Sequence, residues 1–378
     1  MKTPSYFIFL FILFSCRENP KTTEQDNKPI TIDLKKSTVP NKSTAIKNIE
    51  YIPLETDENI LINLIDEIIF HNDKFYILDL TASTIFIFNR DGSFYNKLSK
   101  IGKGPGEYLH IMDFDINTAN NSIWIYDNHS SKIIIYNELL TEFEEIKLKY
   151  YFEEFVIKNN EEIYTRNIYS DGIIHSRIAE LNISNMAYRS IFVNSAYEDG
   201  FDITRFGNIL HKNINGVLVN PRFKGDIFRI ENGTTNKIVE FIGNFPDKSF
   251  VAELKQNLFL MNNPDKYITN IGNIFENSSY IHFRIQEKET LSIVLDKKSG
   301  DALLLDFLNQ ENYFGNHMVY GVAEDKFISL YNTTEYSSSE HFKNRVEKSS
   351  LNNTQKELLL GRSFYDNPML ILFDLTYK

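Results

Sequence analysis

Short apolar runs bounded by polar turn residues recur along the chain from residue 49 to residue 375. Two pairs of runs match each other, residues 75–78 and 85–88 in the first pair and residues 123–126 and 133–136 in the second. Asp79 and Asp127 follow the first run of each pair, Asn89 and Asn137 follow the second, and corresponding residues are 48 apart. A two-strand unit with a period in the forties is typical of a β-propeller blade. The pattern therefore predicts an all-β chain folded as a β-propeller.

Each blade is expected to be a four-stranded antiparallel sheet with Asn, Asp, Gly or Ser in its turns. The Asp91-Gly92 pair is the clearest hairpin signal of the chain. Blades one and two are expected at residues 64–98 and 108–148. Parts of four further blades are expected at residues 162–181, 216–230, 280–296, and 318–331 together with 369–375. The predicted count is six blades, with five or seven as the alternatives.

An open ring would leave strand edges exposed, so the two ends of the propeller are expected to meet in one blade. Residues 49–54, or residues 29–34 before them, are placed to pair with strands of the C-terminal end. Two segments have helical spacing and are expected as short insertions on the rim. Thr354 and Glu357 form a capping-box pattern that opens a helix over residues 355–360, and residues 250–260 show mixed helical spacing.

The first residues predict export. Lys2 supplies a positive start, and residues 6–14 form an apolar run. This run is shorter than the roughly 20 residues of a membrane-spanning helix, but it suits the core of a signal peptide. The Leu-x-Ser-Cys ending at residues 13–16 resembles a bacterial lipobox, in which the cysteine carries the lipid. We therefore expect a lipoprotein signal peptide at residues 1–15, a lipidated Cys16 with a flexible tether over residues 16–47, and a single propeller domain over residues 48–378.

Cys16 is the only cysteine of the chain, so disulfides and cysteine-based metal or nucleophile sites are excluded. The alternative to lipidation is a chance cysteine after an uncleaved leader, since Phe14 is bulkier than is usual in a lipobox. With lipidation, the protein is expected to be a bacterial outer membrane lipoprotein, held to the membrane by its lipid anchor. The sequence leaves open whether it lies on the periplasmic or the cell-surface face.

Several motifs carry a family resemblance. Residues 75–116 look like an NHL repeat, with Asp91-Gly92 and the segment Gly102-Lys103-Gly104-Pro105-Gly106-Glu107-Tyr108. Tyr-Ile-Pro-Leu-Glu-Thr at residues 51–56 and Asp-Asn-Pro-Met-Leu-Ile at residues 366–371 are further matches. Together these motifs resemble the family of lipid-anchored six-bladed β-propellers of Bacteroidetes. The resemblance implies the fold and export, and it implies no particular activity.

The formal net charge of −11 is spread along the chain, with Lys and Arg interspersed among Asp and Glu. A nucleic-acid partner would require a basic face, so none is expected. The glycines of residues 102–107 are expected to turn the chain between blades, because no Ser or Thr and no helix follow as in a phosphate-binding loop.

Asp79 and Asp127 lie at equivalent strand ends. Two such carboxylates could bind a divalent metal in the central channel or act as acid and base. Alternatively, an Asp at a strand end accepts hydrogen bonds from the turn that follows it. The eight histidines form no closely spaced pair, and no Gly-x-Ser-x-Gly motif is present. No catalytic residue is therefore assigned.

Candidates for a ligand-binding face are polar or aromatic residues on predicted loops, namely Lys103, Tyr108, His110, Asn220, Arg222 and Lys224. The chain also holds 21 Tyr and 30 Phe, most of which are expected to pack between blades. Some could instead form a stacking surface for sugars or for the apolar patch of a partner.

The leading hypothesis is a non-catalytic, lipid-anchored propeller without a cofactor that binds a partner protein or an extracellular ligand such as a glycan. The rival hypothesis is a propeller enzyme of the lyase or lactonase type, with a metal in the central channel. The rival predicts several Asp, Glu, Asn or His side chains converging near the axis, with Asp79 and Asp127 as the first members.

Overall fold

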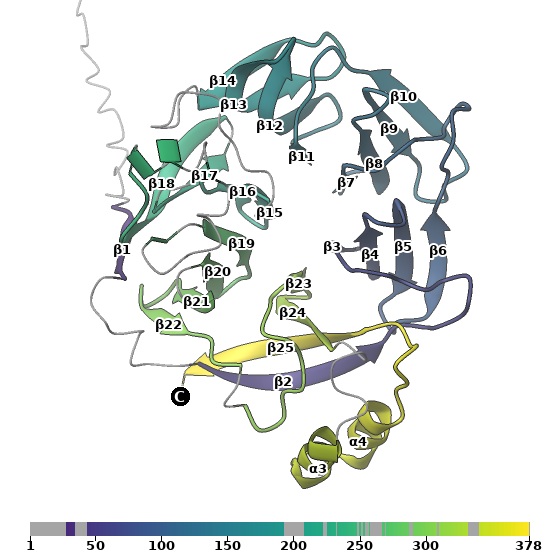
Figure 1. Cartoon of the computed structure of the whole chain (residues 1–378), viewed down its shortest axis with the longest axis vertical. Coiled ribbons are helices and arrows are strands. Elements are labelled where there is room, and N and C mark those ends of the chain that lie inside the picture. Colours follow the sequence, from purple (N-terminus) through teal and green to yellow (C-terminus); the bar gives the residue numbers. More distant parts are fainter. Residues whose placement is uncertain are drawn as a thin grey trace, which may run out of the picture.

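The computed structural model shows a ring of sheets arranged around a central axis (Figure 1). It describes residues 28–34, 44–192, 208–221, 225–231, 233–247, 249–250, 252–253, 257, 267–268, 270–286, 290–307, 310–331 and 340–377. The strands of these residues form six sheets, which confirms the prediction of a six-bladed β-propeller.

Five blades follow one another along the chain, each with its innermost strand first. Blade one holds β3 (Glu67–His71), β4 (Lys74–Asp79), β5 (Thr84–Asn89) and β6 (Phe94–Leu98). Blade two holds β7 (Asp113–Asn117), β8 (Ser122–Asp127), β9 (Lys132–Tyr136) and β10 (Phe143–Lys147). Blade three holds β11 (Glu154–Ile157), β12 (Glu162–Ser170), β13 (Ile173–Asn182) and β14 (Tyr188–Phe192). Blade four holds β15 (Leu210–Asn213), β16 (Gly216–Val219), β17 (Asp226–Glu231) and β18 (Thr234–Ile242). Blade five holds β19 (Asn270–Glu276), β20 (Tyr280–Gln286), β21 (Thr290–Asp296) and β22 (Ala302–Leu304).

The sixth blade joins the two ends of the propeller. From the axis outward it holds β23 (Gly321–Ala323), β24 (Lys326–Tyr331), β25 (Met369–Tyr377) and β2 (Thr44–Pro53). In Figure 1 the purple β2 lies beside the yellow β25, and the two strands are antiparallel. The predicted pairing of residues 49–54 with the C-terminal end is therefore confirmed.

The alternative closing segment, residues 29–34, lies elsewhere. Its strand β1 (Ile30–Asp33) pairs in parallel with β18 and becomes the fifth strand of blade four. This pairing covers the otherwise open outer edge of β18, which satisfies backbone groups that an edge strand leaves exposed. Both β1 and the first residues of β2 lie inside the segment 16–47 that was expected to be a tether.

The apolar core lies between neighbouring blades. One cluster combines Tyr76 and Ile87 of blade one with Phe114, Ile125 and Tyr136 of blade two. Because side chains on both faces of an inner blade strand are covered by the adjacent blades, strands such as β8 are buried throughout. This two-sided burial explains why the strands read as continuous apolar runs rather than as alternating patterns.

Two described helices lie outside the ring, α3 (Glu340–Lys348) and α4 (Asn353–Leu360) (Figure 1). The helix predicted over residues 355–360 is present, but Asn352 is its N-cap and Gln355 completes the capping box. The predicted Thr354 and Glu357 box is wrong, because the helix begins before Thr354. The predicted helical segment 250–260 falls largely outside the described residues. Among the described residues, no helix is long and apolar enough to cross a membrane.

The Asp91-Gly92 hairpin packs closely against the closing blade. Gly92 has a φ of +87°, and a Cβ atom there would lie 2.1 Å from the carbonyl oxygen of Pro53. The backbone N–H of Glu55 donates a hydrogen bond of 2.9 Å to the Gly92 carbonyl. Glycine at this turn therefore allows both the backbone conformation and the contact between blades one and six.

Candidate functional site

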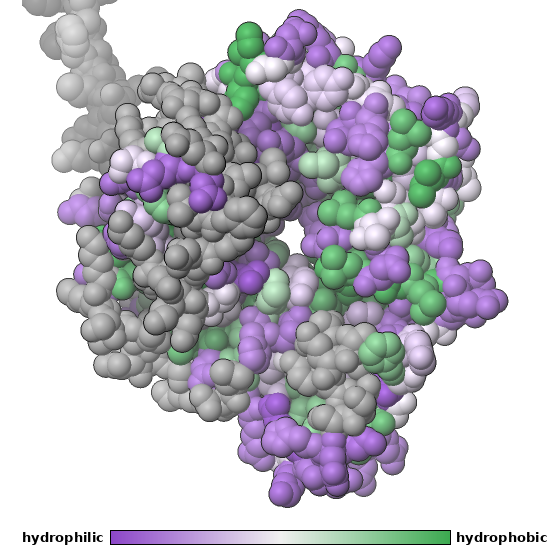
Figure 2. Space-filling view, in the orientation of Figure 1, coloured by the Kyte–Doolittle hydropathy of each residue, from purple (hydrophilic) through white to green (hydrophobic). Residues whose placement is uncertain are grey.

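The innermost strands of adjacent blades contact one another around the axis. A small opening is visible near the middle of the ring in Figure 2. Glu67, Asp113 and Glu154 are the first residues of β3, β7 and β11, so they occupy the same end of three consecutive blades. Asp115 of β7 and Lys212 of β15 join them. We call these five residues the channel cluster.

Most carboxylates of the channel cluster hold neighbouring blades together. Asp113 and Asp115 each accept a hydrogen bond of 2.7 Å, from the backbone N–H groups of Phe155 and Ile157 of blade three. Glu154 accepts hydrogen bonds of 2.7 and 3.0 Å from two N–H groups at the start of blade four. These N–H groups lie on the inner edges of the sheets, where no further strand is available to pair with them.

Glu67 departs from this arrangement. By its place in blade one it corresponds to Asp113 and Glu154. The donor in blade two that corresponds to Phe155 of blade three is the N–H of Phe114, the second residue of β7. That N–H donates instead to Oδ1 of Asp113, at 2.9 Å. Within the described part of the chain, no hydrogen bond to the Glu67 carboxyl is found. Its carboxyl therefore belongs to the channel cluster without holding the next blade.

Lys212 spans from blade four to blade two. Its Nζ atom lies 2.9 and 3.0 Å from the two carboxylate oxygens of Asp115 and donates to the carbonyl of Ile116 at 2.7 Å. Blade three lies between these two blades in the ring, so the contact bypasses one blade. The cluster thus already accommodates one ammonium group beside four carboxyl groups.

The electrostatics of the cluster follow from this excess of carboxyl groups. Burial, followed by the neighbouring carboxyls of Asp115, Glu154 and Asp66, raises the pKa of Glu67 to about 8. Burial and the carboxyl of Glu67 also raise the pKa of Asp113 well above its usual value, although the N–H of Phe155 opposes the rise. The carboxyls of Glu67 and Asp113 therefore disfavour each other's ionisation, and a nearby cation would lower that cost.

Asp79 and Asp127, the sequence candidates for a metal, serve the turns at the ends of β4 and β8. Asp79 accepts from the N–H groups of Asn63 and Ala82, both at 2.8 Å. Asp127 accepts from the N–H groups of Leu109 at 2.8 Å and His129 at 2.9 Å, and from the hydroxyl of Ser130. Both carboxyls are fully buried. Neither belongs to the channel cluster, so the carboxyls near the axis are different from those that the sequence singled out.

The ligand-face candidates that the structure describes do not form one surface. Tyr108 is fully buried, and its hydroxyl donates to the carbonyls of Ser83 and Leu98 at 2.9 and 3.0 Å, so it is a core residue rather than part of a loop face. Asn220 is also buried, and its side chain donates to the carbonyl of Asp226.

Lys103 is exposed on the loop between blades one and two. His110 stacks on His129 with ring centroids 5.4 Å apart. Burial and the neighbouring His129 lower the pKa of His110. Arg222, Lys224 and Cys16 lie outside the described residues.

Sequence reasoning missed the channel cluster because its members look like ordinary strand residues. The available signal was their position: each of the three corresponding carboxyls begins the first strand of a blade. Among the described residues, no three or more His, Cys, Asp or Glu side chains are arranged to hold a metal ion.

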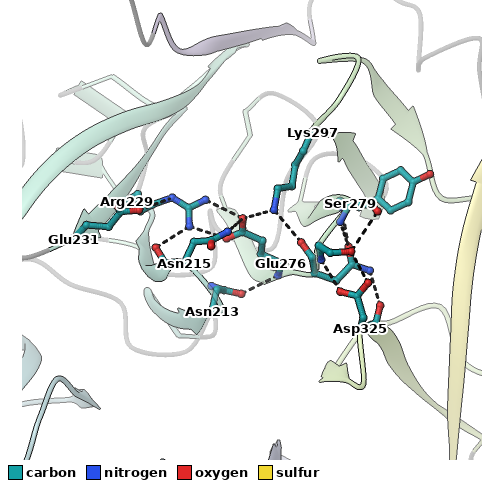
Figure 3. A network of polar contacts seen from close by, with 11 residues as sticks. Asn213, Asn215, Arg229, Glu231, Glu276, Ser279, Lys297 and Asp325 are labelled. Atoms are coloured by element: carbon teal, nitrogen blue, oxygen red, sulfur yellow. Dashed lines mark hydrogen bonds and ion pairs between the residues drawn. The ribbon is translucent and has the colours of Figure 1, made fainter. Parts of the chain in front are cut away.

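A second buried carboxylate lies between blades four and five. Glu276, at the end of β19, receives Arg229 Nη1 at 2.8 Å, Lys297 Nζ at 2.9 Å and Asn215 Nδ2 at 2.9 Å (Figure 3). Its own N–H donates to Oδ1 of Asn213 at 2.8 Å. Burial opposes ionisation of Glu276, but the hydrogen bonds from Arg229 and Lys297 outweigh it and lower the pKa. This network is saturated and joins two blades, which indicates a structural role.

Comparison with known proteins supports the family and the fold. A family model described as a domain of unknown function, DUF4934, matches residues 29–374. A search of curated proteins finds no match. A presumed exported protein of Bacteroides fragilis has a similar structure, with 16% identity and a TM-score of 0.74 over 92% of this chain and 100% of its own. A member of the DUF4221 family from Bacteroides vulgatus has 11% identity and a TM-score of 0.56 over 89% of this chain and 98% of its own.

At these identities the two structures establish the fold alone. A virginiamycin B lyase from Staphylococcus aureus has 15% identity and a TM-score of 0.41, over 75% of this chain and 81% of its own. This similarity is too distant to carry an argument about activity.

Proposed function

Because the chain belongs to the DUF4934 family and folds as a six-bladed β-propeller, we propose that it is an exported, lipid-anchored binding module whose axial channel receives a cationic group of its ligand. The ligand would be a partner protein or an extracellular molecule that presents an ammonium or guanidinium group. The likeness to a presumed exported protein of Bacteroides fragilis supports the exported location.

The observation that carries the proposal is the carboxyl of Glu67. Its counterparts Asp113 and Glu154 are each held by N–H groups of the next blade, whereas the described residues offer Glu67 no donor. A carboxyl that is costly to ionise and lies in a channel is a functional-site candidate rather than a structural connection. A bound cation would relieve the cost of ionising it.

Lys212 indicates the ligand chemistry. Its ammonium binds two carboxylate oxygens and one carbonyl oxygen within the cluster, all within 3.0 Å. Oxygen ligands in this arrangement accept an ammonium through charge-assisted hydrogen bonds. Glu67, Asp113 and Glu154 extend the same type of surface beyond Lys212, so a second ammonium or guanidinium fits its chemistry.

Calorimetric titration of the full chain with spermidine at pH 7 tests this proposal. In two buffers that differ in ionisation enthalpy, binding is expected to release about one proton, because the cation favours the ionised form of Glu67. Glu67→Gln is expected to weaken binding about tenfold and to abolish the proton release. Glu142→Gln, which removes an exposed carboxyl of blade two, serves as the matched control. Equal affinity and equal proton release in wild type and Glu67→Gln would refute the proposal.

Anchoring through Cys16 is tested separately. In cells fed a labelled fatty acid, the wild-type chain is expected to carry the label and to sediment with the outer membrane. Cys16→Ser is expected to lose the label, since no other cysteine can take its place. An unlabelled wild-type protein would remove the lipid anchor from the proposal and leave the channel unaffected.

The enzyme of the lyase or lactonase type stays as the alternative, and one feature favours it. A carboxyl with a pKa near 8 is protonated at neutral pH and can act as a general acid. This alternative expects a divalent metal near the axis. Mass spectrometry of the dialysed protein measures its metal content and separates the two hypotheses. A stoichiometric metal in the wild type, together with a lower metal content in Glu67→Gln, would favour the enzyme.

A further inference from the structure

Blade three carries aromatic side chains that the channel does not use. Tyr150 and Tyr151 precede β11, Tyr169 lies near the end of β12, His175 lies in β13 and Tyr188 begins β14. We call these five residues the tyrosine surface. Since β11 begins and β12 ends at the same end of an antiparallel blade, Tyr151 and Tyr169 lie at the end where Glu154 faces the channel.

The rings of the tyrosine surface are held in two groups of ring contacts, joined through the neighbouring residues Tyr150 and Tyr151. Tyr151 and Tyr169 are stacked, with ring centroids 5.6 Å apart and planes at 25°. Tyr150 meets Tyr188 edge-on at 5.4 Å and His175 at 6.1 Å. Rings that are ordered before binding lose little conformational entropy when a ligand packs on them.

These rings remain accessible although they are ordered. Tyr151 is 39% exposed and Tyr188 is 37% exposed, while Tyr150 and Tyr169 are partly buried. The edges of the surface are polar. Lys149 places its ammonium 5.1 Å from the ring centroid of Tyr150, and the hydroxyl of Ser170 lies 2.8 Å from Nε2 of His175. The surface therefore combines flat apolar faces with hydrogen-bonding groups at their rim.

We propose that the tyrosine surface binds a β-linked glucan. A β-glucose ring carries its hydroxyls equatorially, so both of its faces present C–H groups and its rim presents hydroxyls. This is the complement of tyrosine faces bordered by Lys149, Ser170 and His175. Protein interfaces are also rich in tyrosine, but their cores are depleted in lysine, whereas Lys149 lies over the ring of Tyr150. The surface is separate from the channel, and neither proposal depends on the other.

The test is calorimetric titration of the full chain with laminarihexaose and with cellohexaose. At least one of the two is expected to bind, and Tyr151→Ala is expected to lower the affinity at least fivefold, as loss of a stacking ring does for other planar ligands. Tyr95→Ala is the matched control, because Tyr95 is also 39% exposed but belongs to blade one, where the ammonium of Lys74 lies 4.9 Å from its ring centroid.

The control is expected to bind as wild type does, and an unchanged unfolding temperature of both variants verifies folding. Failure of both oligosaccharides to bind, or an equal loss in Tyr95→Ala, would overturn the proposal. The proposal would also be overturned if the wild-type chain captured a protein partner that the Tyr151→Ala variant no longer binds. Glu67→Gln is expected to leave glucan binding unchanged, so failure of this proposal is distinguishable from failure of the channel proposal.

Discussion

Replacing Glu276 by Gln is expected to destabilise the propeller strongly. The carboxylate has no exposed side-chain surface, and Arg229 and Lys297, whose side chains are 12% and 27% exposed, both donate to it. An amide would keep one acceptor oxygen but turn an N–H₂ group toward these cations. Removing one partner of a buried ion pair costs about 3–5 kcal/mol, because the remaining charge stays buried without compensation.

The stability difference should depend on pH in a defined direction. The pKa of Glu276 is lowered in the folded protein, because the hydrogen bonds from Arg229 and Lys297 outweigh burial. A carboxyl of this kind contributes stability above its unfolded-state pKa and loses that contribution as the pH falls through the lower folded-state pKa. The difference between wild type and Glu276→Gln should therefore be full near pH 7 and should shrink below about pH 4.5.

Urea unfolding of both proteins at pH 7 and at pH 4 measures the effect. Glu231→Gln is the control, since Glu231 contacts the same Arg229 at 3.5 Å with a side chain that is 47% exposed. An exposed pair of this kind contributes at most about 1 kcal/mol. A loss below about 1 kcal/mol in Glu276→Gln, or equal losses in the two variants, would refute the assignment of Glu276 as the buried anchor between blades four and five.

Three further outcomes are expected. Glu67→Gln should change stability little near pH 5 and raise it by about 1–3 kcal/mol at pH 9, because a folded-state pKa of about 8 imposes an ionisation cost that begins above the unfolded-state pKa; urea unfolding at both pH values checks this. Arg90→Met should lower stability by about 1 kcal/mol and reduce its salt dependence, because Arg90 joins blade one to Glu50 and Glu324 of blade six in partly exposed pairs; thermal unfolding at low and high salt checks this. Asp127→Asn should cost about 1–3 kcal/mol without changing spermidine affinity, because its carboxylate serves a turn rather than the channel; a wild-type stability would contradict this.

The blade pattern could be predicted from the sequence because each blade is a local unit. The matching runs around Asp79 and Asp127 indicated the strands of blades one and two, and Asp91-Gly92 indicated a hairpin that the structure contains. The turn role of the two aspartates was also foreseen as an alternative, since an Asp at a strand end has acceptors for the N–H groups that follow it.

Errors arose where a residue depends on a distant part of the chain. Tyr108 is on a predicted loop, yet its hydroxyl is held by carbonyls of blade one, which makes it a core residue. Residues 29–34 were the alternative to residues 49–54 for pairing with the C-terminal end, yet β1 pairs with β18 some 200 residues later in the chain. The local pattern of apolar and polar residues predicts neither of these contacts.

The sequence by itself determined that the chain is a ring of antiparallel sheets, because strand spacing and turn residues act over a few positions. Only the tertiary structure decided that Glu67, Asp113, Glu154 and Lys212 lie close enough to influence one another's charge. This proximity depends on which blades are adjacent and on how deeply each first strand lies in the ring. The tertiary structure also decided that the matching N–H in blade two bonds to Asp113 and leaves Glu67 without a donor among the residues that the structure describes. Such a difference between corresponding positions depends on how blade two packs beside blade one, which the repeating pattern of the sequence does not record.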